Sequence, residues 1–110
     1  MRYSYTYLVE KSSTLIHSLL IGEGNAKQRL MENEMQIMLV LALDVPKELQ
    51  KVKERIIKAL SKKPELGYGD KINMTAFRHS LIGMHNSTAS KIINDLHTIY
   101  ARTRFINEYE

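Results

Sequence analysis

The side chains best suited to bind another molecule are the cations between residues 47 and 63. This segment holds seven Lys or Arg residues and two Glu residues, so it alone exceeds the formal net charge of +4 of the 110-residue chain. With helical spacing, five of the cations share one face, opposite the apolar residues: Lys47, Lys51, Arg55, Lys58 and Lys62. Such a stripe can contact nucleic-acid phosphates or an acidic protein. The preferred interpretation is simpler: a solvated outer face.

A second candidate for binding nucleic acid is the segment 82–96, which resembles a helix-turn-helix reader of DNA with Gly83 in its turn. Three side chains would then face the DNA: Ser87, Thr88 and Lys91. Two features count against this interpretation. His79 stands where the two helices would cross and a small residue is usual. Asp95 balances the charge of Lys91, which removes the electrostatic gain that DNA binding needs. An ordinary helical hairpin is therefore preferred.

Residues of catalytic and metal-binding types form no recognisable active site. Arg78 and His85 faintly resemble the Arg-spacer-His motif of the HEPN ribonucleases, in which His would act as acid or base and Arg would hold phosphate. Gly83 interrupts the spacer, however, so the two side chains need not share a helical face. The four histidines show no metal-ligand spacing. The sequence therefore predicts no catalytic residues, no cofactor and no metal site, although it does not exclude an enzyme.

The elements that position these residues are predicted to be helices, because apolar residues recur with a 3.6-residue period along most of the chain. The expected ranges are 5–21, 25–43, 47–63, 73–82 and 86–104. Asn25 is expected to cap the second helix, and Asn86 or Ser87 the fifth. Pro64, Gly67 and Gly69 predict a loop between the third and fourth helices. Residues 1–110 are thus expected to form a single all-α domain, an irregular bundle of about five helices. The alternation of Tyr3, Tyr5 and Tyr7 leaves helix or strand open for the first ten residues.

The second predicted helix has an unusual composition, because residues 37–43 are apolar on every side. Such a helix needs packing partners all round. It should lie at the centre of the domain or bury one face against a second copy. A stripe of methionines at 31, 35 and 38 favours core or dimer interface over a ligand groove. The residues expected to mediate self-association are Met35, Met38, Leu39 and Leu41.

Composition limits where the protein can work. Apolar residues make up 44% of the chain and charged residues 25%, which is typical of a globular protein. The absence of cysteine excludes disulfides and thiolate metal sites. The first ten residues lack the features of a secretion signal, and the longest apolar run, 37–43, is far shorter than the ~20 residues that span a bilayer. We therefore expect a cytoplasmic protein without a membrane partner.

Several stretches together resemble an uncharacterised family of small all-helical bacterial proteins. They are Gly22-Glu23-Gly24-Asn25 with Arg29-Leu30, then residues 45–49, then residues 60–64, and finally Met84 through Thr88-Ala89 to Ile99-Tyr100. The resemblance covers most of the chain after residue 22, supports the helical prediction and implies no activity. The leading hypothesis is a non-enzymatic, self-associating interaction module, a homodimer through the second or fifth helix. The alternative is a nucleic-acid-binding protein that uses the segment 82–96 or the basic helix 47–63.

Overall fold

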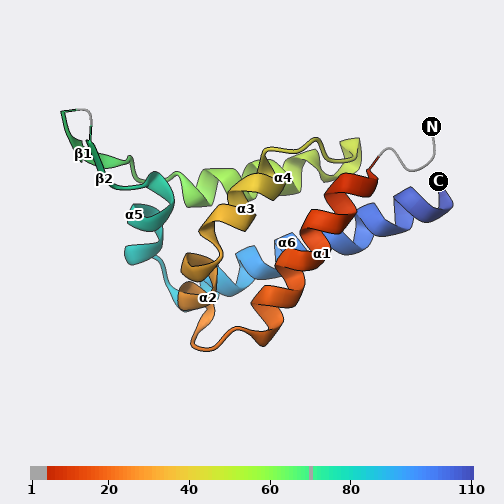
Figure 1. Cartoon of the computed structure of the whole chain (residues 1–110), viewed down its shortest axis with the longest axis horizontal. Helices are drawn as coiled ribbons and strands as arrows, with labels where there is room; N and C mark the ends of the chain where they lie inside the picture. The colour runs from red at the N-terminus through yellow and green to blue at the C-terminus, as the bar shows by residue number, and fades with distance from the viewer. Residues whose placement is uncertain (1–4, 70) are drawn as a thin grey trace.

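The longest helix, α6 (Asn86–Tyr109), is the scaffold on which the other helices pack. Figure 1 shows the computed structural model, which describes residues 5–69 and 71–110. Three helices pack on α6: α1 (Thr6–Ile21), α2 (Ala26–Glu32) and α4 (Gln50–Leu60). The remaining helices in the described part of the chain are α3 (Glu34–Leu41), α5 (Ala76–Ile82) and a short 3-10 helix η1 (Lys47–Leu49). The predicted all-α fold is therefore confirmed.

The core forms where the apolar faces of these helices meet around α6. On α6, Ala89, Ile92, Leu96 and Ile99 are buried at helical spacing. The other helices contribute residues with the same periodicity: Leu8, Leu15 and Leu19 from α1, and Ile56 and Leu60 from α4. The result is an elongated molecule of 47 × 30 × 20 Å, with the start of α1 and the end of α6 at the same end (Figure 1).

The predicted helix 25–43 is wrong as a single element, because the chain forms α2 and α3 with a break at Asn33. Its predicted start is confirmed: the Asn25 side chain accepts a hydrogen bond from the Gln28 amide, and the Gln28 side chain accepts one from the Asn25 amide. At the break, Asn33 Nδ2 donates to the Arg29 carbonyl at 2.8 Å. Local side-chain hydrogen bonds of this kind compete with helix continuation and allow α3 to change direction.

The basic segment and its connection to α5 differ from the prediction in two ways. Residues 47–49 form η1 and the α-helix proper ends at Leu60, three residues earlier than expected. The predicted loop is an antiparallel hairpin of β1 (Leu66–Tyr68) and β2 (Lys71–Met74), which projects at one end of the molecule (Figure 1). Gly69, at φ +63°, provides the turn. As a result, α5 begins at Ala76 rather than 73, with the Thr75 side chain as its cap.

The start of α6 corrects the expectation that Asn86 or Ser87 caps this helix. The N-cap is His85, and its side chain makes no capping hydrogen bond. The Asn86 side chain instead accepts a hydrogen bond from the Lys27 amide at 3.3 Å, which ties α6 to α2.

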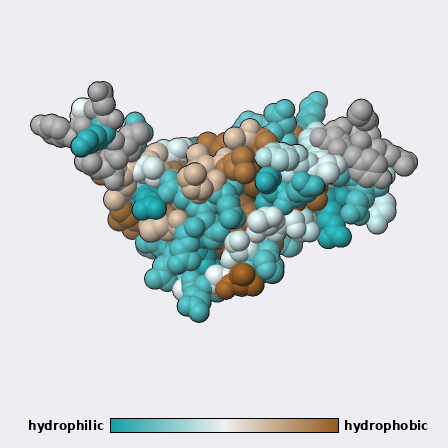
Figure 2. Space-filling view, viewed as in Figure 1, coloured by the Kyte–Doolittle hydropathy of each residue, from teal (hydrophilic) through white to brown (hydrophobic). Residues whose placement is uncertain are grey.

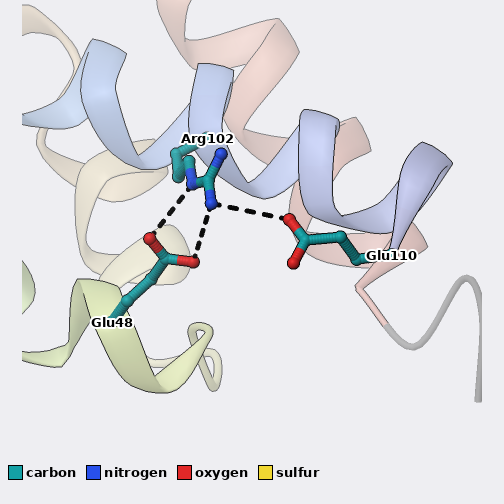
Figure 3. Close-up of polar contacts among 3 residues, drawn as sticks. All are labelled: Glu48, Arg102 and Glu110. Atoms are coloured by element: carbon teal, nitrogen blue, oxygen red, sulfur yellow. Dashed lines mark hydrogen bonds and ion pairs between the residues drawn. The ribbon is translucent and has the colours of Figure 1, made fainter.

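The end of α6 also lies further along the chain than expected, because the helix continues to Tyr109. Arg102 is therefore two turns from the helix end, and its guanidinium binds carboxylates. Its Nε and Nη2 donate to the two oxygens of Glu48 at 3.0 and 3.2 Å, and Nη2 also contacts Glu110 (Figure 3). This ion pair joins η1 to α6 and raises the pKa of Arg102, mainly through the hydrogen bonds to Glu48.

The question of helix or strand at the start of the chain is answered from residue 6 onward, where α1 is helical. Tyr3 lies outside the described residues. The Tyr5 amide donates to Asn107 Oδ1 at 3.0 Å, and Asn107 Nδ2 donates to the Thr6 hydroxyl at 3.3 Å. Asn107 of α6 thus caps α1 from a position 102 residues away in sequence. Within the described part of the chain, no helix is long and apolar enough to cross a membrane.

Candidate functional site

The predicted basic stripe is exposed along the whole of η1 and α4, but its residues have different neighbours. Lys47, Lys51, Arg55, Lys58 and Lys62 are all exposed. Arg55 and Lys62 line hollows between α4 and the first turns of α6. Lys47 lines a separate hollow near the end of α6. The stripe is therefore not one uniform surface: Arg55 and Lys62 face α6, whereas Lys51 and Lys58 line neither of these two hollows.

The segment 82–96, which includes the start of α6, does not have the packing of a helix-turn-helix. Such a motif needs its two helices to cross closely. The seven-residue α5 packs mainly on α4 and α2 rather than on α6. His79 does not occupy a helix crossing with α6; its Nδ1 lies 2.7 Å from the Pro64 carbonyl oxygen. The geometry therefore does not favour reading of a DNA major groove by this segment.

The two predicted sets of contact residues nevertheless meet at one place, which we name the α4–α6 groove. It consists of two adjoining hollows that share Ala59 and Thr88. Side chains with hydrogen-bond donors line it from α4, α5, α6 and the segments next to them: Arg55, Lys62, Lys63, Ser80, His85, Thr88, Lys91 and Asn94. Ser87, the remaining member of the second set, is exposed but does not line either hollow. Residues about 30 positions apart in sequence thus form one surface.

An ion pair between α4 and α6 fixes the groove at one end. Arg55 Nε donates to Asp95 Oδ2 at 3.0 Å, and Arg55 Nη2 donates to Asp95 Oδ1 at 2.8 Å. This two-bond geometry orients the guanidinium. The hydrogen bond and then the charge of Asp95 raise the pKa of Arg55. Asp95 is consequently neutralised by α4, and it is the only carboxylate among the described residues that line the groove.

The other end of the groove is formed by residues that the sequence pattern indicates less clearly. Lys63 and His85 were not singled out as contacts, although Lys63 belongs to the basic segment. Lys63 Nζ lies 3.3 Å from where a Cβ of Gly83 would be, so the glycine leaves room for the ammonium group. The Lys63 amide donates to Ser80 Oγ at 3.0 Å, which holds this part of the chain against α5.

The second candidate surface is the outer side of α3. Ile37, Val40 and Leu41 are buried, whereas Met35, Met38 and Leu39 are 86%, 50% and 40% exposed. Figure 2 shows brown and tan side chains over the region that α3 occupies in Figure 1. Of the two positions predicted for residues 37–43, a place at the centre of the domain does not fit the single chain, and burial of one face against a second copy stays a prediction. Leu41 is also removed from the predicted self-association set, because it faces the core with 6% exposure.

The break at Asn33 changes the predicted methionine stripe as well. Met31 is on α2 and half-buried, so it does not continue the outer side of α3. It lines a shallow hollow beside Met35, together with Met74. Glu34, at the edge of this hollow, accepts hydrogen bonds from Arg78 Nε at 2.8 Å and from the Thr75 hydroxyl at 2.8 Å. The charge of Glu34 is thus already paired, whereas Glu32 of α2 also lines this hollow and is exposed.

No arrangement among the described residues supports the ribonuclease-like motif. Arg78 pairs with Glu34 beside the methionine hollow, whereas His85 lines the α4–α6 groove. The two side chains therefore do not face a common site. In the ranges 5–69 and 71–110, no three His, Cys, Asp or Glu side chains come together in a way that could hold a metal ion.

Comparisons with known proteins give no match: no protein-family model, no curated protein and no solved structure is similar to this chain. The resemblance to a family of small bacterial helical proteins therefore stays a prediction, as does the cytoplasmic location. Two surfaces of the structure bear on function: the outer side of α3 and the α4–α6 groove.

Proposed function

We propose that the chain is a non-enzymatic interaction module that self-associates through its α3 face, defined as Met35, Met38, Leu39 and Ala42. The observation that carries this proposal is the spacing of these exposed residues. They follow one another at i, i+3, i+4 and i+7, which is the pattern of a helix that packs against another helix. An apolar stripe of this kind is unfavourable in water unless a partner covers it.

The α3 face suits a second copy of the same chain better than a charged partner. Glu34 is the only charged residue of α3, and Arg78 already pairs with it. Two such faces can therefore meet around a twofold axis without burying an unpaired charge, as an isologous dimer requires. Ala42 at the end of the face leaves room for close approach of two helices.

The other predicted interface, on the last predicted helix, has less support. Its exposed aromatic residues lie near the end of α6, where Phe105 and Tyr109 pack on each other with ring centroids 5.1 Å apart. The Arg102 guanidinium lies 5.2 Å from the Phe105 ring centroid. Neighbours in the same chain thus already cover part of this surface, whereas Met35 is 86% exposed.

Light scattering during size-exclusion chromatography tests the proposal. At micromolar concentration we expect a mass near twice 12.7 kDa that falls toward one chain on dilution. Leu39→Glu should give a monomer, because two copies of this carboxylate would be buried without partners. Leu20→Glu is the matched control, since Leu20 is an exposed leucine of α1 outside the α3 face. A monomeric wild-type protein, or a dimer that persists in Leu39→Glu, would contradict the proposal.

A further inference from the structure

We propose that the α4–α6 groove binds the phosphate backbone of duplex nucleic acid without reading its sequence. The inference begins with the convergence of a basic set and a largely neutral polar set that are separate in the sequence. Arg55 and Lys62 of the stripe lie across from Thr88 and Lys91 of α6. Phosphate contacts of duplexes come mainly from Arg, Lys, Ser, Thr and Asn side chains. The groove presents these residue types from two helices at once.

The polar chemistry of the groove is that of an anion-binding surface. Lys62, Lys63 and Lys91 contribute positive charge, and the Thr88 hydroxyl and the Asn94 amide add neutral donors. The Asp95 carboxylate forms an ion pair with Arg55, so these two charges offset each other and the three lysines give the groove its net positive charge. A polyanion that enters the groove therefore meets donors and cations along its length.

The length of the groove limits how many phosphates it can hold. Thr88 and Asp95, which line it from α6, are seven residues apart on this helix, or about 10 Å at 1.5 Å per residue. Phosphates of one DNA strand follow at about 3.4 Å along the duplex axis, so the groove spans about three of them. Neutralising about three phosphates predicts a slope of about −3 in a plot of log affinity against log salt concentration.

The residues around the groove favour a duplex over a single strand and over a peptide. No Phe, Tyr or Trp is among the described residues that line it, so unpaired bases have no stacking platform there. Of its large apolar residues, Ile92 is buried with 3% exposure and Met84 is partly buried, and no fully exposed large hydrophobic side chain of the described residues lines the groove. A peptide would thus lack the apolar anchors that protein interfaces use.

Fluorescence anisotropy with labelled nucleic acid tests this assignment. The probes are two duplex DNAs of unrelated sequence, each about 20 base pairs long, the single strand of one of them, and poly-L-glutamate as a competitor. We expect both duplexes to bind with similar affinity and the predicted salt slope between about 50 and about 200 mM salt. Lys91→Gln should weaken binding about tenfold at the lower salt concentration and reduce the slope by about 1.

The matched control is Lys51→Gln, which removes the same charge from the stripe on α4 but from a residue that does not line the groove. It should leave the slope unchanged. Equal losses in Lys51→Gln and Lys91→Gln would overturn the proposal, because binding would then follow net charge. Absence of duplex binding, tighter binding of the single strand, or displacement of the duplex by poly-L-glutamate at equal charge would overturn it too. Light scattering on the same samples reports self-association separately, so the two proposals can fail independently.

Discussion

At the scale of single residues, Thr103 is the clearest imperfection in the core. Its hydroxyl is fully buried on α6 and has no hydrogen-bond partner within the described part of the chain. A buried hydroxyl without a partner costs about 1–3 kcal/mol relative to its hydration in the unfolded chain. Thr103→Val removes the hydroxyl and keeps the branched shape. We expect the free energy of unfolding to rise by about 1 kcal/mol, measured by urea denaturation.

The control for this prediction is Thr98→Val on the same helix. Thr98 is exposed, and its hydroxyl donates to the Asn94 carbonyl at 3.0 Å. The substitution should change stability by less than about 0.5 kcal/mol. A destabilised Thr103→Val protein would show that the hydroxyl has a partner, such as a bound water molecule.

Asn107 is the residue whose loss should most affect the start of α1. Its side chain accepts a hydrogen bond from the Tyr5 amide and donates one to Thr6. Asn107→Leu leaves that amide without its partner and should lower the free energy of unfolding by about 1–2 kcal/mol. Asn107→Asp keeps the acceptor oxygen and should lose less. Hydrogen exchange should accelerate in the first turn of α1 for the leucine variant only. Uniform acceleration along the chain in both variants would contradict this role.

The residue types at the groove could be predicted from the sequence, but their pairing could not. The charge excess of residues 47–63 is visible in the sequence alone and identifies Lys62 as a candidate contact. Asp95 could offset the charge of Lys91 on its own helix or pair with Arg55, which is 40 positions away in the sequence. The outcome depends on how α4 packs on α6. Helical periodicity reports which face of a helix is buried, not which helix lies against it.

At the scale of elements, the sequence predicts helices that have one buried face and does not predict elements that lack a clear periodic pattern. The 3.6-residue period locates α1 and α4 well, because each has one buried face. The break at Asn33 is not predicted because residues 25–43 contain no Gly or Pro that would indicate the end of a helix. The hairpin 66–74 was missed because strands of three and four residues are too short to show a period of two.

The capping box at the start of α2 yields a prediction for Gly24. This residue has φ +90°, and a Cβ there would lie 2.3 Å from Gln28 Oε1, the atom that accepts the Asn25 amide. Gly24→Ala is therefore strained and also displaces the cap. We expect a loss of about 1–3 kcal/mol in the free energy of unfolding. Gln28→Ala, which removes only the cap contact, should cost less. Equal losses in the two variants would show that the backbone at residue 24 is not strained.

At the scale of the whole molecule, the two proposed surfaces use different elements. The α3 face belongs to α3, whereas the residues that line the α4–α6 groove come from α4, α6 and the segments next to them. Neither a residue of α3 nor Ala42 lines the groove. Packing of two copies through α3 should therefore leave both grooves open. A dimer would then present two phosphate-binding surfaces to one duplex.

This arrangement predicts that affinity depends on duplex length only when the protein can dimerise. A duplex of about 10 base pairs is about 34 Å long, shorter than the 47 Å length of one chain, and should occupy a single groove. A duplex of about 40 base pairs can engage both grooves, and binding of the second then benefits from a high effective concentration. For the wild-type protein we expect the longer duplex to bind at least tenfold more tightly per site.

Leu39→Glu should remove this length dependence and leave the affinity for the short duplex unchanged, because Leu39 does not line the groove. Lys91→Gln should instead weaken binding of both duplexes. Leu20→Glu should change neither the length dependence nor the affinity for either duplex. Affinities measured by anisotropy, with the mass of each variant determined in the same buffer, distinguish these outcomes. If Leu39→Glu is monomeric and still binds the longer duplex as tightly per site as the wild-type protein does, the grooves act alone. The dimer then has a role other than avidity.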